Sequence, residues 1–296
     1  MMYGRQSMVW ALLLGGCLLA GTAGAKEITI LDGMSNSLFG ATTSHGAFNE
    51  DNEVEAGCIN SQPWDLEGMF LGATPWDDDR GANVLTLVGG WNFLQGALSG
   101  TRTYRSGDIF IALTEKPYFG DAGEAGNNAK PAGTQSLYMS DWLYDFVIDA
   151  NWDAGTWQVY RNGPGVDVTP LVSESINGGS NPWARDPNGN PSGIAVEGAV
   201  GNSIVQETLA DGDTGFNGGT HYAVSFDLAW LISDLNMIPP KDVYFHFTEE
   251  CGNDNLMGYV EAKDWQRVTN PVPEPASMGI LGMGLVGLVA TRLRKK

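Results

Sequence analysis

Bulky apolar residues recur at every second position in several short stretches of this chain, and this period of two is the strongest constraint on its fold. Ile109, Ile111 and Leu113 form one such set, and Phe245 and Phe247 belong to another. Successive side chains of a β-strand point to opposite faces of its sheet. Each stretch therefore predicts a strand with one apolar face packed on a core.

Eight segments are predicted to be strands, and turns rich in the chain's 40 glycines separate them. They are 28–31, 64–71, 84–88, 109–113, 144–148, 157–160, 222–226 and 243–248. Residues 149–155 predict a hairpin connection, with Gly155 available for a left-handed conformation. Only 228–235 has helical spacing, which is too little helix to cover a parallel sheet. We predict an all-β fold, a single β-sandwich of jelly-roll or lectin-like type with long loops.

The first 25 residues have the layout of a secretory signal peptide. Arg5 precedes an apolar run from Met8 to Ala20, and the small residues Ala23 and Ala25 mark a cleavage point after Ala25. The run is shorter than the roughly 18 apolar residues of a membrane span. Cys17 lies in a loose match to a lipoprotein cleavage box, but the residues after it are apolar and disfavour lipidation. We predict export, with the signal removed.

The segment between the two ends, residues 26–271, is predicted to be one extracellular domain and is strongly acidic. It contains 11 of the chain's 16 basic residues and 34 of its 35 acidic ones, a formal charge of −23. Such a field repels nucleic acid and anionic lipid. Nucleic-acid binding is therefore excluded from the functions considered, and the scattered acids are typical of a solvated surface.

Two cysteines remain after the signal is removed, Cys58 near the beginning of the domain and Cys251 near its end. An even number of cysteines in an oxidising compartment predicts a disulfide. Two buried thiols are the alternative. If the pair forms, the two ends of the domain are neighbours.

Calcium is the ion that the sequence favours, as a possible cofactor. Asp149, Asn151 and Asp153 place oxygen ligands at alternate positions, as at the start of a calcium loop, and Asp211 and Asp213 form a second acidic turn. Neither segment has the remaining features of such a loop. Asp and Asn are also ordinary turn residues, so plain turns are favoured at both places.

An exported, acidic, aromatic-rich β-sandwich also has to be considered as a glycan-active protein. Asp65 and Glu67 share one strand face and could approach the separation of a glycosidase pair. No complete catalytic motif is found, and no catalysis is predicted. Exposed tryptophans can stack on sugar rings. Those in apolar segments are expected in the core: Trp64, Trp91, Trp157 and Trp230. Those in polar turns are expected to be exposed: Trp76, Trp142, Trp152 and Trp183.

The last 25 residues, 272–296, combine three features in a fixed order. Pro273, Glu274 and Pro275 come first; an apolar run without charge follows over 276–290; and a basic cluster ends the chain, formed by Arg292, Arg294, Lys295 and Lys296. The run is shorter than an ordinary transmembrane helix. The basic end would stay in the cytoplasm and leave the domain outside.

This layout resembles the PEP-CTERM sorting signal of exosortase substrates in Gram-negative bacteria that make exopolysaccharide. The resemblance implies transient insertion in the inner membrane, recognition of the Pro-Glu-Pro segment by exosortase, and removal of the helix. Residues 50–55, 64–68, 106–110 and 251–254 also resemble segments of uncharacterised exosortase-dependent surface proteins. We therefore predict a non-catalytic protein of the cell surface or the extracellular matrix, associated with exopolysaccharide or biofilm. A secreted carbohydrate-binding protein or glycoside hydrolase with the same signal is the alternative.

Overall fold

The computed structural model describes most of the domain between the two terminal segments. The described residues are 26–31, 36–37, 43–45, 48–50, 53–54, 58–113, 115–119, 138–162, 171–172, 181–188, 194–201, 203–235 and 241–264. They belong to one compact unit, residues 23–269. No helix among them is long and apolar enough to cross a membrane. The signal peptide and the sorting segment lie outside the described residues.

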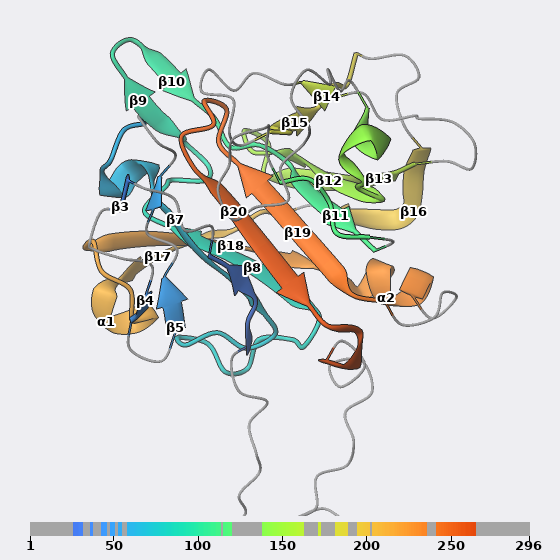
Figure 1. The fold of residues 1–296 in the computed structure, drawn as a ribbon, viewed down its shortest axis with the longest axis horizontal. Helices are drawn as coiled ribbons and strands as arrows, with labels where there is room; N and C mark the ends of the chain where they lie inside the picture. Colours follow the sequence, from blue (N-terminus) through green and yellow to red (C-terminus); the bar gives the residue numbers. More distant parts are fainter. Residues whose placement is uncertain are drawn as a thin grey trace, which may run out of the picture. The chain divides into compact units, whose positions relative to one another are not determined.

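Two antiparallel sheets form the domain, which is all-β as predicted (Figure 1). The first has the order β1-β7-β8-β18-β17, and the second has the order β16-β13-β12-β11-β19-β20-β2. The strands of the first sheet are β1 (Lys26–Glu27), β7 (Leu66–Leu71), β8 (Val84–Gly89), β18 (Thr220–Asp227) and β17 (Gln206–Ala210). Those of the second are β16 (Ile194–Gly201), β13 (Thr156–Arg161), β12 (Phe146–Asn151), β11 (Ile109–Ala112), β19 (Val243–Thr248), β20 (Asn255–Val260) and β2 (Thr29–Ile30).

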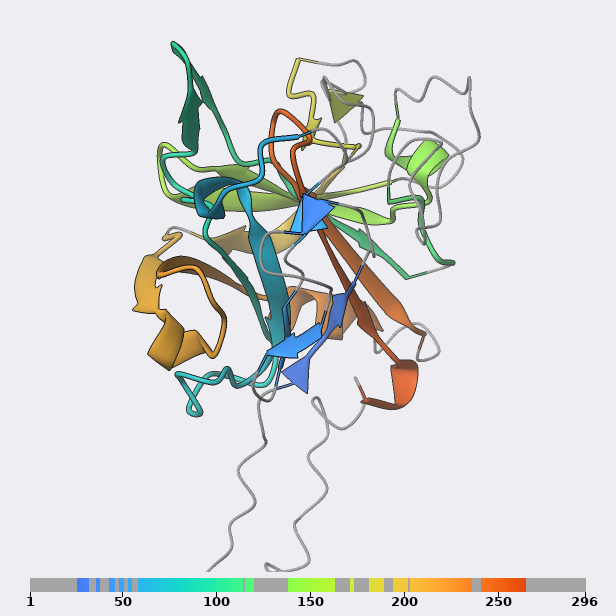
Figure 2. The ribbon, with the colours of Figure 1, turned by 60° about the vertical axis from the view of Figure 1, so that its left-hand side comes forward.

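Smaller elements surround these sheets. Hairpin β9–β10 (Ala97–Ser99 and Arg102–Tyr104) projects from the domain in Figure 2. The short helices are η1 (Gln62–Trp64), η2 (Met139–Trp142), α1 (Asp211–Thr214) and α2 (Ala229–Leu235), and the remaining short strands are β3 (Asn36–Ser37), β4 (Thr43–His45), β5 (Phe48–Glu50), β6 (Glu53–Val54), β14 (Leu171–Val172) and β15 (Ala184–Arg185).

The apolar faces of the two sheets share one core. Leu87 and Phe226 of the first sheet and Ile111, Phe245 and Phe247 of the second are all buried in it. The period of two placed Ile111, Phe245 and Phe247 on such a face, and these predicted faces are confirmed. The same period placed Tyr144 on one face with Phe146 and Ile148, which is wrong for Tyr144: β12 begins at Phe146, and Tyr144 lies in a second cluster. Full burial of one such side chain contributes roughly 2 kcal/mol.

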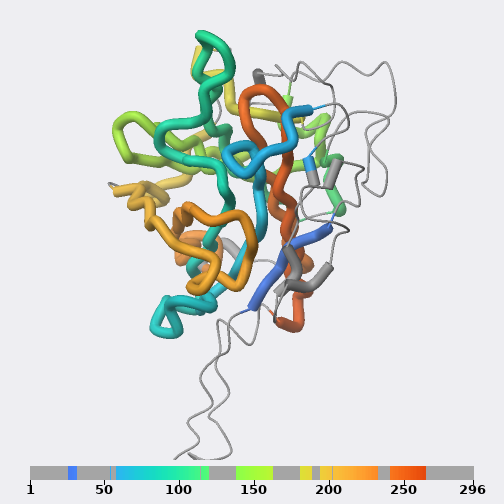
Figure 3. Tube along the Cα trace, turned by 90° about the vertical axis from the view of Figure 1, so that its left-hand side faces the viewer, coloured from blue at the N-terminus to red at the C-terminus, as the bar shows by residue number. Residues whose placement is uncertain are grey.

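The first strands of the chain join the two sheets. β1 pairs with β7 in the first sheet and β2 pairs with β20 in the second, so the backbone crosses between the sheets at Ile28. The Ile28 N–H donates to Met69, and its carbonyl accepts from Tyr259. Figure 3 shows this N-terminal segment in blue beside the red C-terminal strand. The two ends of the domain are therefore neighbours.

The opposite face of the second sheet is also covered. Phe110, Tyr144 and Val147 form a second buried cluster with Trp142 of η2. His246 lies among these rings, stacked parallel to Tyr144, and is fully buried. It faces away from the main core, as its alternation with Phe245 and Phe247 predicts. Trp142 was expected to be exposed, and that prediction is wrong because η2 folds its ring onto the sheet.

The predicted disulfide is absent from the described residues, where Cys58 and Cys251 are not joined. Neighbouring residues nevertheless lie together. The Asn253 side chain accepts from the Ile59 N–H at 2.7 Å and donates to the Ile59 carbonyl at 3.1 Å. These two hydrogen bonds join Ile59, which follows Cys58, to Asn253, two residues after Cys251, and the pairing of the cysteines stays a prediction.

We expect Cys58 and Cys251 to be joined in protein recovered after export. The Cys58→Ser variant should lose about 4 kcal/mol of unfolding free energy, because a long loop is no longer closed. Wild-type and variant protein are compared by urea unfolding with and without reductant, and reductant should affect the wild type alone. Alkylation of both thiols in unreduced, denatured wild-type protein would contradict the pairing.

Candidate functional site

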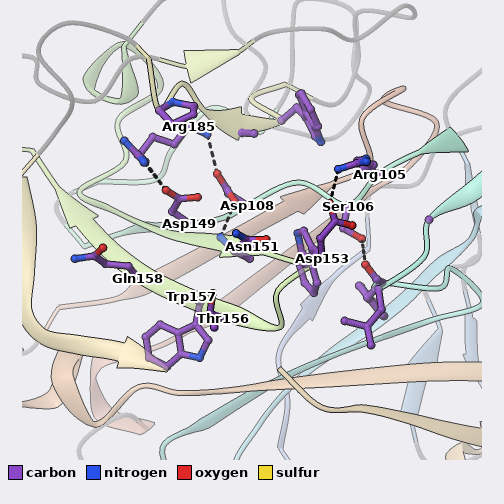
Figure 4. A pocket seen from close by; sticks show the side chains of 18 of the residues that line it. Arg105, Ser106, Asp108, Asp149, Asn151, Asp153, Thr156, Trp157, Gln158 and Arg185 are labelled. Carbon is purple, nitrogen blue, oxygen red and sulfur yellow. Dashed lines mark hydrogen bonds and ion pairs between the residues drawn. The ribbon is translucent and has the colours of Figure 1, made fainter. Parts of the chain in front are cut away.

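A groove of about 1170 Å³ opens where several loops meet at one end of the second sheet (Figure 4). The turn of hairpin β12–β13 forms one side, and residues 93–96 and 105–108 form the next. Residues 183–187, which include β15, close the groove on the third side. Its lining combines aromatic rings with charged and amide side chains from distant parts of the chain.

Asp108 holds two of these walls together. Its carboxylate accepts from the backbone N–H of Ala150 at 2.9 Å and from that of Arg185 at 2.8 Å. Burial, and after it the neighbouring Asp149 carboxylate, raise the pKa of Asp108 to about 8, against the lowering effect of the two backbone N–H groups and of the Arg185 charge. Since both oxygens are bonded to the main chain, Asp108 acts as a clamp between β12 and β15.

Gly107 allows the floor of the groove to close. A Cβ atom at this position would lie 2.3 Å from the Trp183 carbonyl oxygen and 2.6 Å from that of Thr248. The Gly107 N–H donates to Thr248, and its carbonyl accepts from the Trp152 indole at 2.9 Å. Only glycine permits this close approach of three chain segments.

Arg185 and Asp149 form the charged wall of the groove. The Arg185 Nε donates to Asp149 Oδ2 at 2.7 Å, and the guanidinium lies 3.8 Å from the centre of the Tyr160 ring. The Arg185 side chain is 6% exposed and that of Asp149 29% exposed. An ion pair stacked on an aromatic ring in this way is held in one orientation.

The rim has a second ion pair of the same kind in a different environment. Arg105 donates to Asp153 at 2.8 Å, and the two side chains are 64% and 71% exposed. Such exposed pairs contribute roughly 0 to 1 kcal/mol. The buried pair and the exposed pair thus offer a matched comparison.

Aromatic rings form the rest of the lining. Trp152 and Trp183 are half-buried, while Trp157 is 9% exposed and still reaches the groove. Trp152 stacks on Phe93, with the ring centres 6.2 Å apart. The expected exposure of Trp152 and Trp183 is therefore met in part, whereas Trp157 belongs both to the core and to the site.

The residues predicted to bind calcium are engaged separately. Asp149 and Asp153 pair with different arginines, and Asn151 accepts from the Ala154 N–H within the hairpin turn. Asp213 accepts from the Ala210 N–H at the start of α1, and Asp211 bonds to His221. Among the described residues, no group of three His, Cys, Asp or Glu side chains could hold a metal ion. The described residues therefore contain no acidic cluster that could serve as the predicted calcium site.

The two acids considered for hydrolysis, Asp65 and Glu67, are both fully buried, away from the groove. Glu67 bonds to His221 Nδ1 at 2.7 Å, and the other ring nitrogen of His221 bonds to Asp211 at 2.9 Å. Sequence reasoning missed this arrangement because α1 and the residues after it cover the outer face of β7. A glycosidic bond cannot reach carboxylates in this position.

Sequence reasoning also missed Asp108, Arg185 and Tyr160 as groove residues. The local sequence does not distinguish Arg185 or Tyr160, because their roles come from contacts across the sheet and with a distant loop. The short segment Ser106–Gly107–Asp108 is the one signal available, since it places a glycine between two polar residues before a strand. The residues of signal cleavage and sorting (Ala23, Ala25, Pro273, Glu274, Pro275, Arg292, Arg294, Lys295 and Lys296) lie outside the described residues.

Comparison with known proteins identifies the end of the chain. Residues 271–295 match the model of the PEP-CTERM protein-sorting motif. No curated protein and no solved structure matches the chain. The predicted sorting signal is thus confirmed, and the resemblance of the domain to exosortase-dependent surface proteins stays a prediction.

The buried His221 cluster should give the protein a characteristic pH dependence. Burial lowers the pKa of His221, but its bonds to Glu67 and Asp211 outweigh this and raise the pKa above its ordinary value. The contribution of charged His221 to the free energy of unfolding is therefore complete below pH 6.5 and is lost as pH rises through the raised pKa. His221→Gln should cost about 3 kcal/mol at pH 6, because it removes the charged partner of the buried Glu67 and leaves Gln62 as its neutral donor. The cost should be less at pH 9, measured by urea unfolding.

His246 provides the control, because it is a buried histidine with the opposite shift. Burial lowers its pKa to about 3, so it folds in the neutral form and opposes folding as pH falls below 6.5. His246→Phe should therefore stabilise the protein progressively below that pH. Parallel pH profiles for the two variants would contradict the assigned ionisation states.

Proposed function

We propose that this chain is an exosortase-processed protein of the cell surface or extracellular matrix that binds glycan chains of the exopolysaccharide in its groove. The sorting motif at residues 271–295 supports export and processing. The groove, with its aromatic and polar lining, is the single observation that carries the binding role. The two antiparallel sheets around one core support a β-sandwich of lectin-like type.

The lining matches the chemistry of a sugar ring. The faces of pyranose rings carry C–H groups that pack on aromatic rings, and Trp152 and Trp183 are available at the groove surface. Sugar hydroxyls both donate and accept hydrogen bonds. Asp149, Asn151 and Gln158 bring carboxylate and amide groups to the same groove.

A binding role without catalysis fits Asp108 and Asp149, the two least exposed carboxyls of the groove, best. Both Asp108 oxygens accept from backbone N–H groups, and Asp149 is held by Arg185. A glycosidase needs one carboxyl to transfer a proton to the glycosidic oxygen while the other attacks or activates water. These two are instead engaged in holding β12 and β15 together, so we assign no catalysis to them.

Processing at the motif is tested by mass spectrometry of the protein from surface and medium, in host strains with and without exosortase. We expect a C-terminus near Pro273 to Ser277 only when the enzyme is present. Replacement of Glu274 by Gln should test recognition of the motif directly. Protein that still ends in Arg292 to Lys296 in both strains would contradict the processing step.

Glycan binding by the groove is tested with Trp183→Ala in a sedimentation assay with exopolysaccharide from the same host. The loss of one stacking ring should weaken binding by roughly 10-fold. Trp76→Ala is the matched control, since Trp76 is also half-buried but packs on Phe70 outside the groove. Equal losses in both variants, or none in either, would argue against the groove as the site.

A further inference from the structure

We infer that the groove selects neutral glycans over acidic ones. This inference rests on the proposed glycan binding and concerns the charge of the ligand. It follows from the ion pairs that the two arginines of the groove form with carboxylates.

Only two cationic side chains line the groove among the described residues, and each is paired with a carboxylate. Arg185 bonds to Asp149 through Nε at 2.7 Å and through a terminal nitrogen at 2.5 Å. One face of its guanidinium is covered by Tyr160. Arg105 pairs with Asp153 at the rim. An acidic sugar would have to displace Asp149 to reach the buried Arg185, and the charge of the exposed Arg105 is already offset by Asp153.

The electrostatic field around the groove acts in the same direction. The two arginines of the lining are matched by Asp149 and Asp153, so the groove offers an anionic sugar no net positive charge. The whole domain carries a formal charge of −23 over residues 26–271. An anionic polymer, which repeats its charge along its length, is repelled by this field at long range.

The uncharged polar groups that remain suit hydroxyls. Asn151 and Gln158 accept from other groups through their carbonyl oxygens, Asn151 from the Ala154 N–H and Gln158 from the Tyr160 hydroxyl. Their NH₂ groups are donors. The Asp149 carboxylate, at 29% exposure, is an acceptor for a sugar hydroxyl at the groove surface. A neutral pyranose can use these groups without breaking an ion pair.

The test uses paired oligosaccharides and isothermal titration calorimetry. Cello-, manno- and amylo-oligosaccharides are each titrated beside the uronate made by oxidising their C6 hydroxymethyl groups, so that charge is the main difference within a pair. We expect a neutral oligomer to bind about 10-fold more tightly than its uronate. Tighter binding of a uronate overturns the inference while leaving glycan binding intact. Failure of every oligomer and of the host exopolysaccharide to bind would overturn both.

Asp149→Asn should change the preference. Removal of the carboxylate leaves the Arg185 charge available to an acidic sugar, so uronate affinity should rise about 10-fold while neutral affinity falls. Asp153→Asn is the matched control; it makes the same change at the exposed pair and should alter either affinity less than about 2-fold. Equal effects of the two variants would overturn the role given to the buried pair.

A second measurement needs no variant and covers the case in which Asp149→Asn does not fold. Wild-type affinity for a neutral oligomer should be unchanged between about 0.05 and 0.5 M NaCl, because no net charge is paired on binding. A loss of affinity over this range would show that the ligand uses a protein charge and would overturn the inference.

Discussion

The packing of alternate apolar side chains between two antiparallel sheets is the constraint on which the rest of the structure depends. Phe245 and Phe247 point into the main core, and His246 between them points into the second cluster under η2. With both faces of β19 buried, a shift of one residue in its register would exchange these sets and bury His246 in the wrong core. The crossing of the backbone at Ile28 then fixes the sheets to each other at one edge.

The groove is built on this fixed frame by a few polar contacts. Asp108 follows directly on the Gly107 crossing point and joins β12 to β15 through two backbone N–H groups. That link places Arg185 against Asp149 and Tyr160. The aromatic rings come from the hairpin turn and from the loop before β15, so core packing sets the position of the walls and the Asp108 clamp sets their spacing. A site on so rigid a base is suited to recognising a repeating polymer.

Sequence periodicity was sufficient for the strands that face the main core, for hairpin β12–β13 and for α2. It did not indicate β20, although Leu256 and Val260 lie in the main core, because Gly258 interrupts the apolar alternation of this strand. It also did not indicate β16 and β17, whose exposed edge positions lack an apolar period. Asp108 and Arg185 could not be assigned to one site, because they are 77 residues apart and meet only through a distant loop. Trp142 shows the same limit: a polar neighbourhood in sequence indicated exposure, yet η2 folds that ring into a buried cluster. The sorting signal could be identified from the sequence because its three features follow one another within residues 272–296.

The most direct test of the account is to record the indole N–H resonances of the ¹⁵N-labelled protein by NMR while the host exopolysaccharide, broken into short oligomers, is added. If the groove binds the glycan, the resonances of Trp152, Trp157 and Trp183 should shift together and saturate with one affinity, while those of Trp64, Trp91 and Trp230 stay unchanged. Shifts concentrated on Trp76, or no shifts at the three groove indoles while the oligomers bind, would contradict the assignment of the groove as the glycan site.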